Sequence, residues 1–224
     1  MRLGVDLLSV SRFTPVAEHR RYRTLVFTAT ELAQAGELGT PRYAERLAGR
    51  FCVKEATCKL LGRGFGQGLR WRDIEVTNDP WGAPAVTLSG GAGRLAGEAG
   101  VEEIAVTLTH QADLVVAVAA SPSGRCPSPY RPGRPEDGAD QVIDPARDAL
   151  EEVAALAAEV FGTSAAEVRA AESFAGGLGV SSSLTVELLA RLEQRYGIRV
   201  PEPDFYRMTD LGRTYQVVAR AARW

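Results

Sequence analysis

The sequence of 224 residues has few cysteines, methionines and histidines: three Cys, two Met and two His. Because the cysteine number is odd and the spacing does not fit a zinc site, we expect reduced thiols in a cytoplasmic protein rather than a disulfide framework. Long apolar runs are also missing, since no stretch of the sequence approaches the ~20 residues that cross a bilayer. Residues 1–8 are too short and too interrupted to be a signal peptide.

The sequence also lacks a large excess of positive or negative charge. The formal net charge is −2, which gives no general reason to expect binding to nucleic acid or to a membrane surface. The rest of the composition is ordinary for a globular protein, and the length suits one large domain or two small ones.

The composition changes sharply at Ser121. Residues 121–140 are rich in proline, glycine, serine and charge and have almost nothing to bury, which predicts a semi-extended linker. The chain is therefore expected to divide into a first part, residues 1–120, and a second part, residues 141–224, which is near the lower size limit for independent folding.

The first part alternates stretches typical of strands and helices, which predicts an α/β (α+β) fold. Its first expected strand, residues 3–10, is apolar apart from Asp6. A buried carboxylate is costly unless it is paired or holds a metal ion, and both explanations stay open. Thr28 and Glu31 have the spacing of a capping box at a helix start. Further strands are expected over residues 69–77, 85–88, 104–110 and 114–120, and a helix over 91–100, with His110 just after a strand end.

Residues 44–68 begin as a helix and end in a glycine-spaced turn. Basic residues step by four, so that a helix aligns them as one basic row; they are Arg42, Arg46, Arg50 and Lys54. Glu55 and Lys59 are also four apart, and the turn that starts at Gly62 lets backbone N–H groups approach a ligand. These features suit a polyanion and a metal ion. A solvated ion pair and an ordinary turn are the commoner explanations of such features when the segment is taken alone.

The second part is expected to be a small helical bundle. Helices are predicted over residues 145–161, 182–196 and 210–222, with a short turn or helical piece over 201–208. An irregular loop is expected up to Val180, and Gly197 is a plausible helix stop.

The first part resembles the holo-acyl-carrier-protein synthases, the small bacterial phosphopantetheinyl transferases. The resemblance covers essentially all of residues 1–120. It rests on several elements in order: Gly4-Val5-Asp6, the segments 27–31 and 47–56, Lys59, Gly62-Arg63-Gly64, and the segments 73–82 and 106–110.

This resemblance implies transfer of 4′-phosphopantetheine from coenzyme A to a serine of an acyl carrier protein, with release of 3′,5′-ADP. It implies that Asp6 and Glu55 hold Mg²⁺, in agreement with the preference of magnesium for carboxylates and phosphates. The metal and Lys59 would neutralise charge on the leaving nucleotide. Either Glu55, through a water, or His110 would remove the proton of the serine.

The resemblance also implies a nucleotide site and an assembly. The expected nucleotide contacts are Arg42, Arg50, Gly62, Gly64 and Gly66, with His110 beside the reacting centre. A homotrimer is implied, in which the nucleotide lies between neighbouring subunits.

The second part resembles an acyl carrier protein, in which a serine of an Asp-Ser-Leu triplet bears the phosphopantetheine arm. The similar residues are Phe174 and the segments 178–180, 187–193 and 197–201. Counting without gaps places the serine at Ser182, but the triplet here is Ser181-Ser182-Ser183. A slip of one residue places Ser183 before Leu184 instead, and simple capping of a helix is a third explanation.

Three functions stay open at this stage. The first is a transferase that loads its own carrier. In this case the ~20-residue linker would raise the local carrier concentration toward the millimolar range. Alternatively, the chain is a transferase with a silent carrier that serves docking or regulation, or a scaffold that binds coenzyme A without turnover. Docking is expected to be electrostatic, between Glu187 and Glu193 and the basic segment 12–23.

Overall fold

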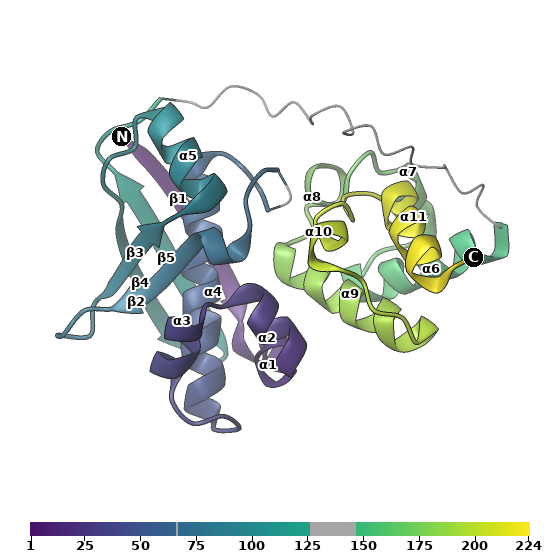
Figure 1. The fold of residues 1–224 in the computed structure, drawn as a ribbon, viewed down its shortest axis with the longest axis horizontal. Helices are drawn as coiled ribbons and strands as arrows, with labels where there is room; N and C mark the ends of the chain where they lie inside the picture. Colours follow the sequence, from purple (N-terminus) through teal and green to yellow (C-terminus); the bar gives the residue numbers. More distant parts are fainter. Residues whose placement is uncertain (66, 126–146) are drawn as a thin grey trace. The chain divides into compact units, whose positions relative to one another are not determined.

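The computed structural model describes residues 1–65, 67–125 and 147–224 (Figure 1). The chain divides into two compact units, Met1–Arg131 and Pro132–Trp224. Most of the expected linker, residues 126–140, lies outside the described residues. The α/β class of the first unit and the helical class of the second are confirmed. In the part of the chain that the structure describes, no helix is long and apolar enough to span a membrane.

The first unit contains two antiparallel sheets (Figure 1). The larger has the strand order β1-β5-β4, formed by Arg2–Ser9, Leu114–Ser121 and Ala105–Gln111. The smaller is the hairpin of β2 (Ile74–Asn78) and β3 (Pro84–Leu88). In the register of the larger sheet, Asp6 lies opposite Ala117, which lies opposite Leu108.

The helix α4 (Pro41–Leu61) lies against one face of the larger sheet and is the centre of the unit. It starts at Thr40, whose side chain accepts a hydrogen bond from the backbone N–H of Tyr43, and it ends at Gly62 in the left-handed conformation with φ 74°, which glycine adopts without strain. Residues 47–58 are all buried. The helix is therefore surrounded on all sides rather than packed on one face.

The expected basic row on α4 is split by this burial. Arg42 and Arg46 are exposed, whereas Arg50 and Lys54 are buried. The Lys54 Nζ atom lies 2.9 Å from the Oε1 atom of Glu31. A charge pattern along one helix could not reveal this, because the burial comes from α3 and β2, which pack over that side.

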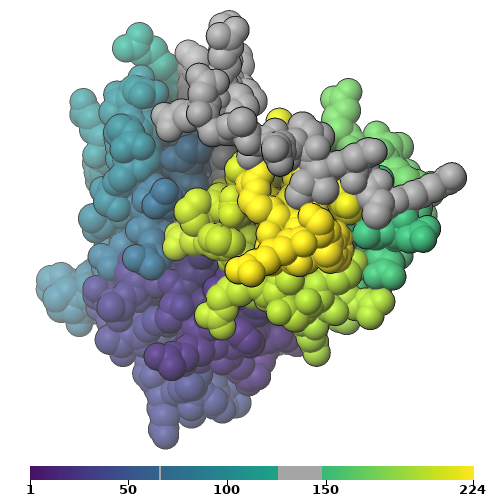
Figure 2. All heavy atoms as spheres, turned by 45° about the vertical axis from the view of Figure 1, so that its right-hand side comes forward, coloured from purple at the N-terminus to yellow at the C-terminus, as the bar shows by residue number. Residues whose placement is uncertain are grey.

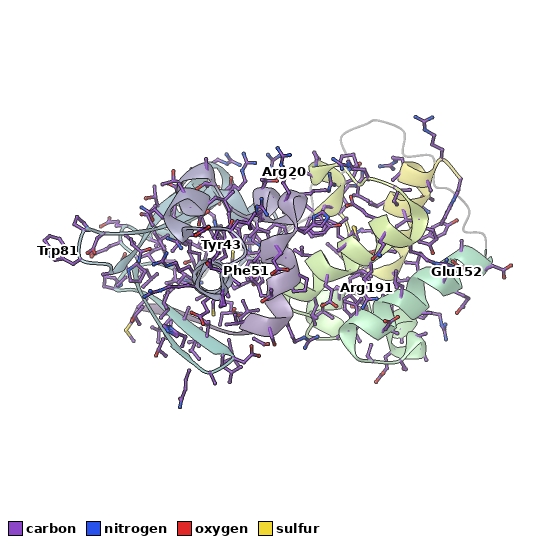
Figure 3. All side chains as sticks on the ribbon, turned by 90° about the horizontal axis from the view of Figure 1, so that it is seen from below. Arg20, Tyr43, Phe51, Trp81, Glu152 and Arg191 are labelled. Carbon is purple, nitrogen blue, oxygen red and sulfur yellow. The ribbon has the colours of Figure 1, made fainter. Side chains whose placement is uncertain are left out.

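Shorter helices complete the first unit. They are α1 (Val10–Glu18), α2 (Arg20–Val26), α3 (Ala29–Ala35) and α5 (Gly90–Ala99). The capping box of Thr28 and Glu31 at the start of α3 is confirmed. Phe13 and Phe51 pack with ring centroids 4.9 Å apart in the core, and Trp81 projects from the β2–β3 turn, 89% exposed (Figure 3).

Two boundaries of the expected strands were wrong. A 3₁₀ turn, η1 (Trp71–Asp73), precedes β2, so the strand starts at Ile74 rather than at Leu69. His110 lies within β4, which continues to Gln111. In this strand His110 pairs with Val115, so ladder hydrogen bonds extend the strand past the polar residues that suggested a loop.

The second unit is a bundle of helices. Its elements are α6 (Arg147–Phe161), α7 (Ala165–Ala170), α8 (Phe174–Gly177), α9 (Ser182–Tyr196), α10 (Glu202–Phe205) and α11 (Leu211–Ala222). The bounds of α9 and its end at Gly197 are confirmed. The irregular loop expected up to Val180 was wrong, because it contains α7 and α8. Helices this short carry no helical period that a sequence pattern can reveal.

Local hydrogen bonds hold these short helices in place. Ser164 and Glu167 form a capping box at the start of α7. Hydrogen bonds from Thr163 and Ser164 lower the pKa of Glu167 to about 2. Phe174 of α8 inserts into the core and packs on Phe161 with ring centroids 5.0 Å apart. The segment before α9 is therefore anchored at both ends.

Candidate functional site

The structure brings Asp6 of β1 and Lys59 of α4 into contact. The Lys59 Nζ atom donates one hydrogen bond to the Asp6 Oδ1 atom at 2.9 Å and another to the carbonyl oxygen of Val5 at 2.9 Å. The Asp6 side chain is 11% exposed and the Lys59 side chain is 53% exposed. The ammonium group therefore lies where a dissolved ligand can reach it.

This contact depends on a close approach of two backbones at Gly4. A Cβ atom at Gly4 would lie 1.9 Å from the carbonyl oxygen of Ala56 and 2.6 Å from the backbone nitrogen of Leu60. Only a residue without a side chain lets β1 lie so close to α4. Because Ala56 follows Glu55 and Leu60 follows Lys59, this approach places the β1 backbone beside the turn of α4 that carries both predicted site residues.

Glu55 lies one helical turn before Lys59 and is 8% exposed. Its carboxylate and that of Asp6 both act on the buried thiol of Cys52. Burial is the largest cause that raises the pKa of this thiol; the charge of Asp6 and a hydrogen bond with it come next, and the charge of Glu55 adds to them. Both carboxylates thus lie near one buried side chain of α4.

The donor set of this site suits a magnesium ion that is shared with a substrate. Magnesium commonly combines one or two protein carboxylates with waters and substrate phosphates. In the described ranges, no group of three or more His, Cys, Asp or Glu side chains could hold a metal ion by itself. The carboxylates of Asp6 and Glu55 are ligands of the kind that magnesium takes, so these residues fit the expected ion.

The glycine turn after α4 uses its N–H groups within the chain. The N–H of Gly62 donates to the carbonyl oxygen of Lys59 at 3.1 Å, and the N–H of Gly64 donates to the Oε1 atom of Gln67 at 3.2 Å. Gly66 lies outside the described residues. Gly62 therefore ends the helix, and the binding of phosphates by Gly62 and Gly64 stays a prediction.

The two arginines expected at the nucleotide occupy different surroundings. Arg50 is 5% exposed and donates to the carbonyl oxygen of Val76 at 3.1 Å and to the Asn78 Oδ1 atom at 2.9 Å. Its hydrogen bonds hold β2 to α4. Arg42 is exposed but precedes Glu55 by thirteen residues of one helix, about 20 Å at 1.5 Å per residue. Their roles as nucleotide contacts stay predictions, and one chain does not bring Arg42 near the carboxylates.

His110 also lies away from the carboxylates within one chain. It is exposed on β4, and β5 separates β4 from β1. Two strand spacings amount to about 10 Å. His110 is therefore beyond hydrogen-bond reach of Asp6 in the same subunit.

The three serines lie at the start of α9. Ser181 is the N-cap residue, but its hydroxyl makes no capping hydrogen bond. It lies 2.9 Å from the hydroxyl of Ser183 instead. Ser182 is the first residue of the helix. Simple capping by the hydroxyl of Ser181 therefore does not explain the serine run.

Sequence reasoning missed the contribution of Arg2 to this site. The Arg2 Nε atom donates to the carbonyl oxygen of Leu60 at 2.6 Å and so ties β1 to the last turn of α4. A single arginine near the start of a chain gives no signal of this role. A signal did exist for Gly4, because a glycine inside an apolar strand often marks a close approach of another backbone.

Comparison with known proteins identifies the family of the chain. The model of the 4′-phosphopantetheinyl transferase superfamily matches residues 2–119, and the model of the phosphopantetheine attachment site matches residues 151–218. The chain therefore belongs to the 4′-phosphopantetheinyl transferase superfamily, and its second unit contains a carrier domain.

Individual relatives match the first unit over most of their length. The holo-acyl-carrier-protein synthase of Desulforudis audaxviator is 39% identical over 123 residues, which cover 54% of this chain and 93% of the relative. That of Geotalea daltonii is 38% identical over 117 residues, covering 51% of this chain and 92% of the relative. A solved structure of holo-ACP-synthase from Plasmodium yoelii is 30% identical with a TM-score of 0.46, covering 53% of this chain and 91% of that one.

Proposed function

We propose that this protein transfers 4′-phosphopantetheine from coenzyme A to a serine of an acyl carrier protein and releases 3′,5′-ADP. The observation that carries the proposal is the contact of β1 with α4, which pairs Asp6 with Lys59 one helical turn from Glu55 in a chain of the transferase superfamily. The relatives named holo-acyl-carrier-protein synthase support the choice of acceptor. We assign the transfer to residues 1–120, a linker to 121–140 and the carrier to 141–224.

The reaction forms a bond between the serine Oγ atom and the phosphorus that bears the pantetheine arm. The bond from that phosphorus to the bridging oxygen of the pyrophosphate breaks, and the electron pair leaves with 3′,5′-ADP. Mg²⁺ held by Asp6 and Glu55 would offset the negative charge of the pyrophosphate. Lys59, half exposed on a flexible stem, can turn from Asp6 to the leaving phosphate and stabilise its charge.

A base must accept the proton of the serine as the new bond forms. Glu55, one helical turn before Lys59, is the first candidate and would accept the proton through a water. His110 is the second candidate, and the distance across the sheet requires that it act from a neighbouring subunit. We propose the same arrangement for Arg42, which is remote from Glu55 along its own helix.

We therefore propose a homotrimer with the nucleotide between subunits. Large apolar side chains are exposed on the face of the β1-β5-β4 sheet that α4 does not cover: Leu3, Val5, Leu7 and Leu114. A contiguous exposed apolar patch marks a protein interface.

We expect wild type to sediment as a trimer. Val118→Lys places a charge opposite Val5 in the middle strand, and we expect this variant to sediment as a monomer with little transfer activity. A monomeric wild type that transfers at full rate contradicts the proposal.

In the fused carrier we propose Ser182 as the acceptor. It starts α9, and the other two hydroxyls of the run contact each other. Ser182→Ala should then abolish the mass increase of this chain with coenzyme A, whereas loss of the adduct only in Ser183→Ala would show that the ungapped alignment is wrong.

The proposed activity is tested by the mass of a separate acyl carrier protein after incubation with the enzyme, coenzyme A and Mg²⁺. Wild type should add the phosphopantetheine mass. Asp6→Asn and Glu55→Gln should each slow transfer by about 10²–10³-fold, the cost of removing one charge-stabilising group. Glu45→Gln, an exposed position of the same helix, is the matched control and should leave the rate unchanged.

Two outcomes would contradict this function. If wild type yields no product but binds coenzyme A, the chain is a scaffold rather than a transferase. If both carboxylate variants transfer at the rate of wild type, the site lies elsewhere.

A further inference from the structure

The contact of Lys59 with Asp6 places a positive charge directly on a predicted metal ligand. The Lys59 Nζ atom lies 2.9 Å from the Asp6 Oδ1 atom, and it also donates a hydrogen bond of 2.9 Å to the carbonyl oxygen of Val5. Both acceptors belong to β1, so two hydrogen bonds hold the ammonium group on this strand. A metal ion that binds the Asp6 carboxylate must therefore share it with the ammonium group or displace that group.

This contact weakens the site for a divalent cation in two ways. The hydrogen bond engages Oδ1, one of the two oxygens that Asp6 can offer to a metal ion. The ammonium charge also repels a second cation, and water screens this repulsion less than on an open surface because the Asp6 side chain is 11% exposed. With Lys59 in place, the charges of Asp6, Glu55 and Lys59 sum to one negative charge, whereas the two carboxylates alone sum to two.

Lys59 can leave Asp6 when a better partner is present. Its side chain is 53% exposed, and its ammonium group sits on a flexible four-carbon stem. The strand β1 leads into α1, which begins four residues after Asp6, and the space-filling view shows α1 and α2, in purple, at the surface of the unit (Figure 2). A pyrophosphate offers several charged oxygens, and lysine binds phosphate groups as a point charge. A dissolved pyrophosphate can therefore take the ammonium group from Asp6.

We infer that Lys59 couples the binding of the metal ion to the binding of the nucleotide. Without a nucleotide, the ammonium group competes with Mg²⁺ for Asp6. With the pyrophosphate of coenzyme A bound, the ammonium group turns to the phosphates and frees the carboxylate. The coupling is reciprocal, so Mg²⁺ raises the affinity for coenzyme A by the same factor as coenzyme A raises the affinity for Mg²⁺. The inference rests on the proposed function and adds to the role of Lys59 at the leaving group.

The first test measures metal binding without nucleotide, with Mn²⁺ as the probe and electron paramagnetic resonance to count the free ion. Lys59→Met should bind Mn²⁺ about 10–100-fold more tightly than wild type, the value of one hydrogen bond to a charged group expressed as an equilibrium constant. Lys59→Arg keeps the positive charge and should bind Mn²⁺ no more tightly than wild type. Equal affinity of Lys59→Met and wild type would overturn the inference, as would an equal gain in Lys59→Arg.

Two further variants show where a gain in Mn²⁺ affinity arises. Arg94→Met removes an exposed positive charge of α5 and so matches the change in net charge; it should bind Mn²⁺ as wild type does. Asp6→Asn added to Lys59→Met should abolish the gain. A gain in Arg94→Met equal to that in Lys59→Met, or one that survives Asp6→Asn, means that the ion binds elsewhere and contradicts the inference.

The second test measures the coupling by calorimetry. Ser182→Ala with Ser183→Ala serves as the background, because it removes both candidate acceptor serines of the fused carrier. The coupling factor is the ratio of the dissociation constants of coenzyme A without and with Mg²⁺. Adding Lys59→Met should make this factor at least about tenfold smaller, since the competition that the nucleotide relieves is gone. The same coupling factor with and without Lys59→Met would overturn the inference.

These measurements separate the inference from the function on which it rests. If wild type transfers the phosphopantetheine arm to a separate acyl carrier protein but Lys59→Met gains no affinity for Mn²⁺, the inference is wrong and the function stands. If wild type binds coenzyme A and Mg²⁺ but transfers nothing, the proposed function is wrong.

Discussion

Gly4→Ala is expected to abolish phosphopantetheine transfer although no catalytic group changes. The new Cβ atom would lie 1.9 Å from the carbonyl oxygen of Ala56, a distance that forces β1 away from α4. Overpacking of this kind costs about 1–3 kcal/mol of stability. The same shift separates Asp6 from Lys59, and a misplacement of about 1 Å can cost about 10²-fold in rate.

The measurement combines urea denaturation with the rate of transfer to a separate carrier under conditions where the variant is folded. Gly97→Ala is the matched control, since this exposed glycine of α5 has nothing within 4 Å of the added Cβ atom. It should be as active as wild type and no less stable, because alanine favours a helix by up to about 1 kcal/mol over glycine. A folded Gly4→Ala protein with full activity would show that the close approach does not position the site.

The parts of the fold that the sequence predicts well depend on neighbours in the chain. The capping box of Thr28 and Glu31 and the bounds of α9 follow from residues three or four positions apart, so a local pattern contains them. The burial of Arg50 and Lys54 depends on α3, η1 and β2, which are distant in sequence. A regular four-residue step of basic residues is therefore compatible with an exposed row and with a buried one.

The same distinction holds for the site. Residue chemistry and the family resemblance predict Asp6, Glu55 and Lys59 as site residues, and the structure brings Asp6 and Lys59 into contact. The four-residue spacing suggested that Lys59 pairs with Glu55, whereas the structure pairs it with Asp6 across β1. No local pattern indicates that His110 lies far from the carboxylates, because that separation follows from the strand order of the sheet. The separation of Arg42 from Glu55 follows from thirteen residues of one helix, so the sequence already contained it.

Lys54→Met is expected to destabilise the first unit by about 3–5 kcal/mol, the usual cost of removing one partner from a buried ion pair. Lys54 and Glu31 are both fully buried. The Lys54 Nζ atom donates to the carbonyl oxygens of Trp71, at 2.9 Å, and of Ile74. Without the ammonium group, Glu31 keeps the backbone N–H of Val76 but loses its ion-pair partner in the interior. Urea denaturation followed by the fluorescence of the buried Trp71 measures the loss.

The control for this variant is a solvent-exposed ion pair of the second unit. Arg169 and Glu151 lie 2.6 Å apart with both side chains about half exposed, so Arg169→Met should cost less than about 1 kcal/mol. A loss of similar size in Lys54→Met would mean that the buried pair adds little to the fold.

Glu31→Gln should produce a stability that rises with pH. Burial is the largest cause that lowers the pKa of Lys54 from 10.5, and the charge of Glu31 opposes it. Removing that charge lowers the folded-state pKa further. Between this pKa and 10.5 the unfolded chain binds more protons than the folded one, so the free energy of unfolding increases with pH in that interval and is lost as the pH falls. Between pH 6 and pH 9 the free energy of unfolding of Glu31→Gln should therefore rise more than that of wild type. In wild type the carboxylate of Glu31 keeps the pKa of Lys54 higher, so the interval is narrower. If the difference in the free energy of unfolding between the two proteins is the same at both pH values, Lys54 does not release its proton and the fold tolerates its buried charge.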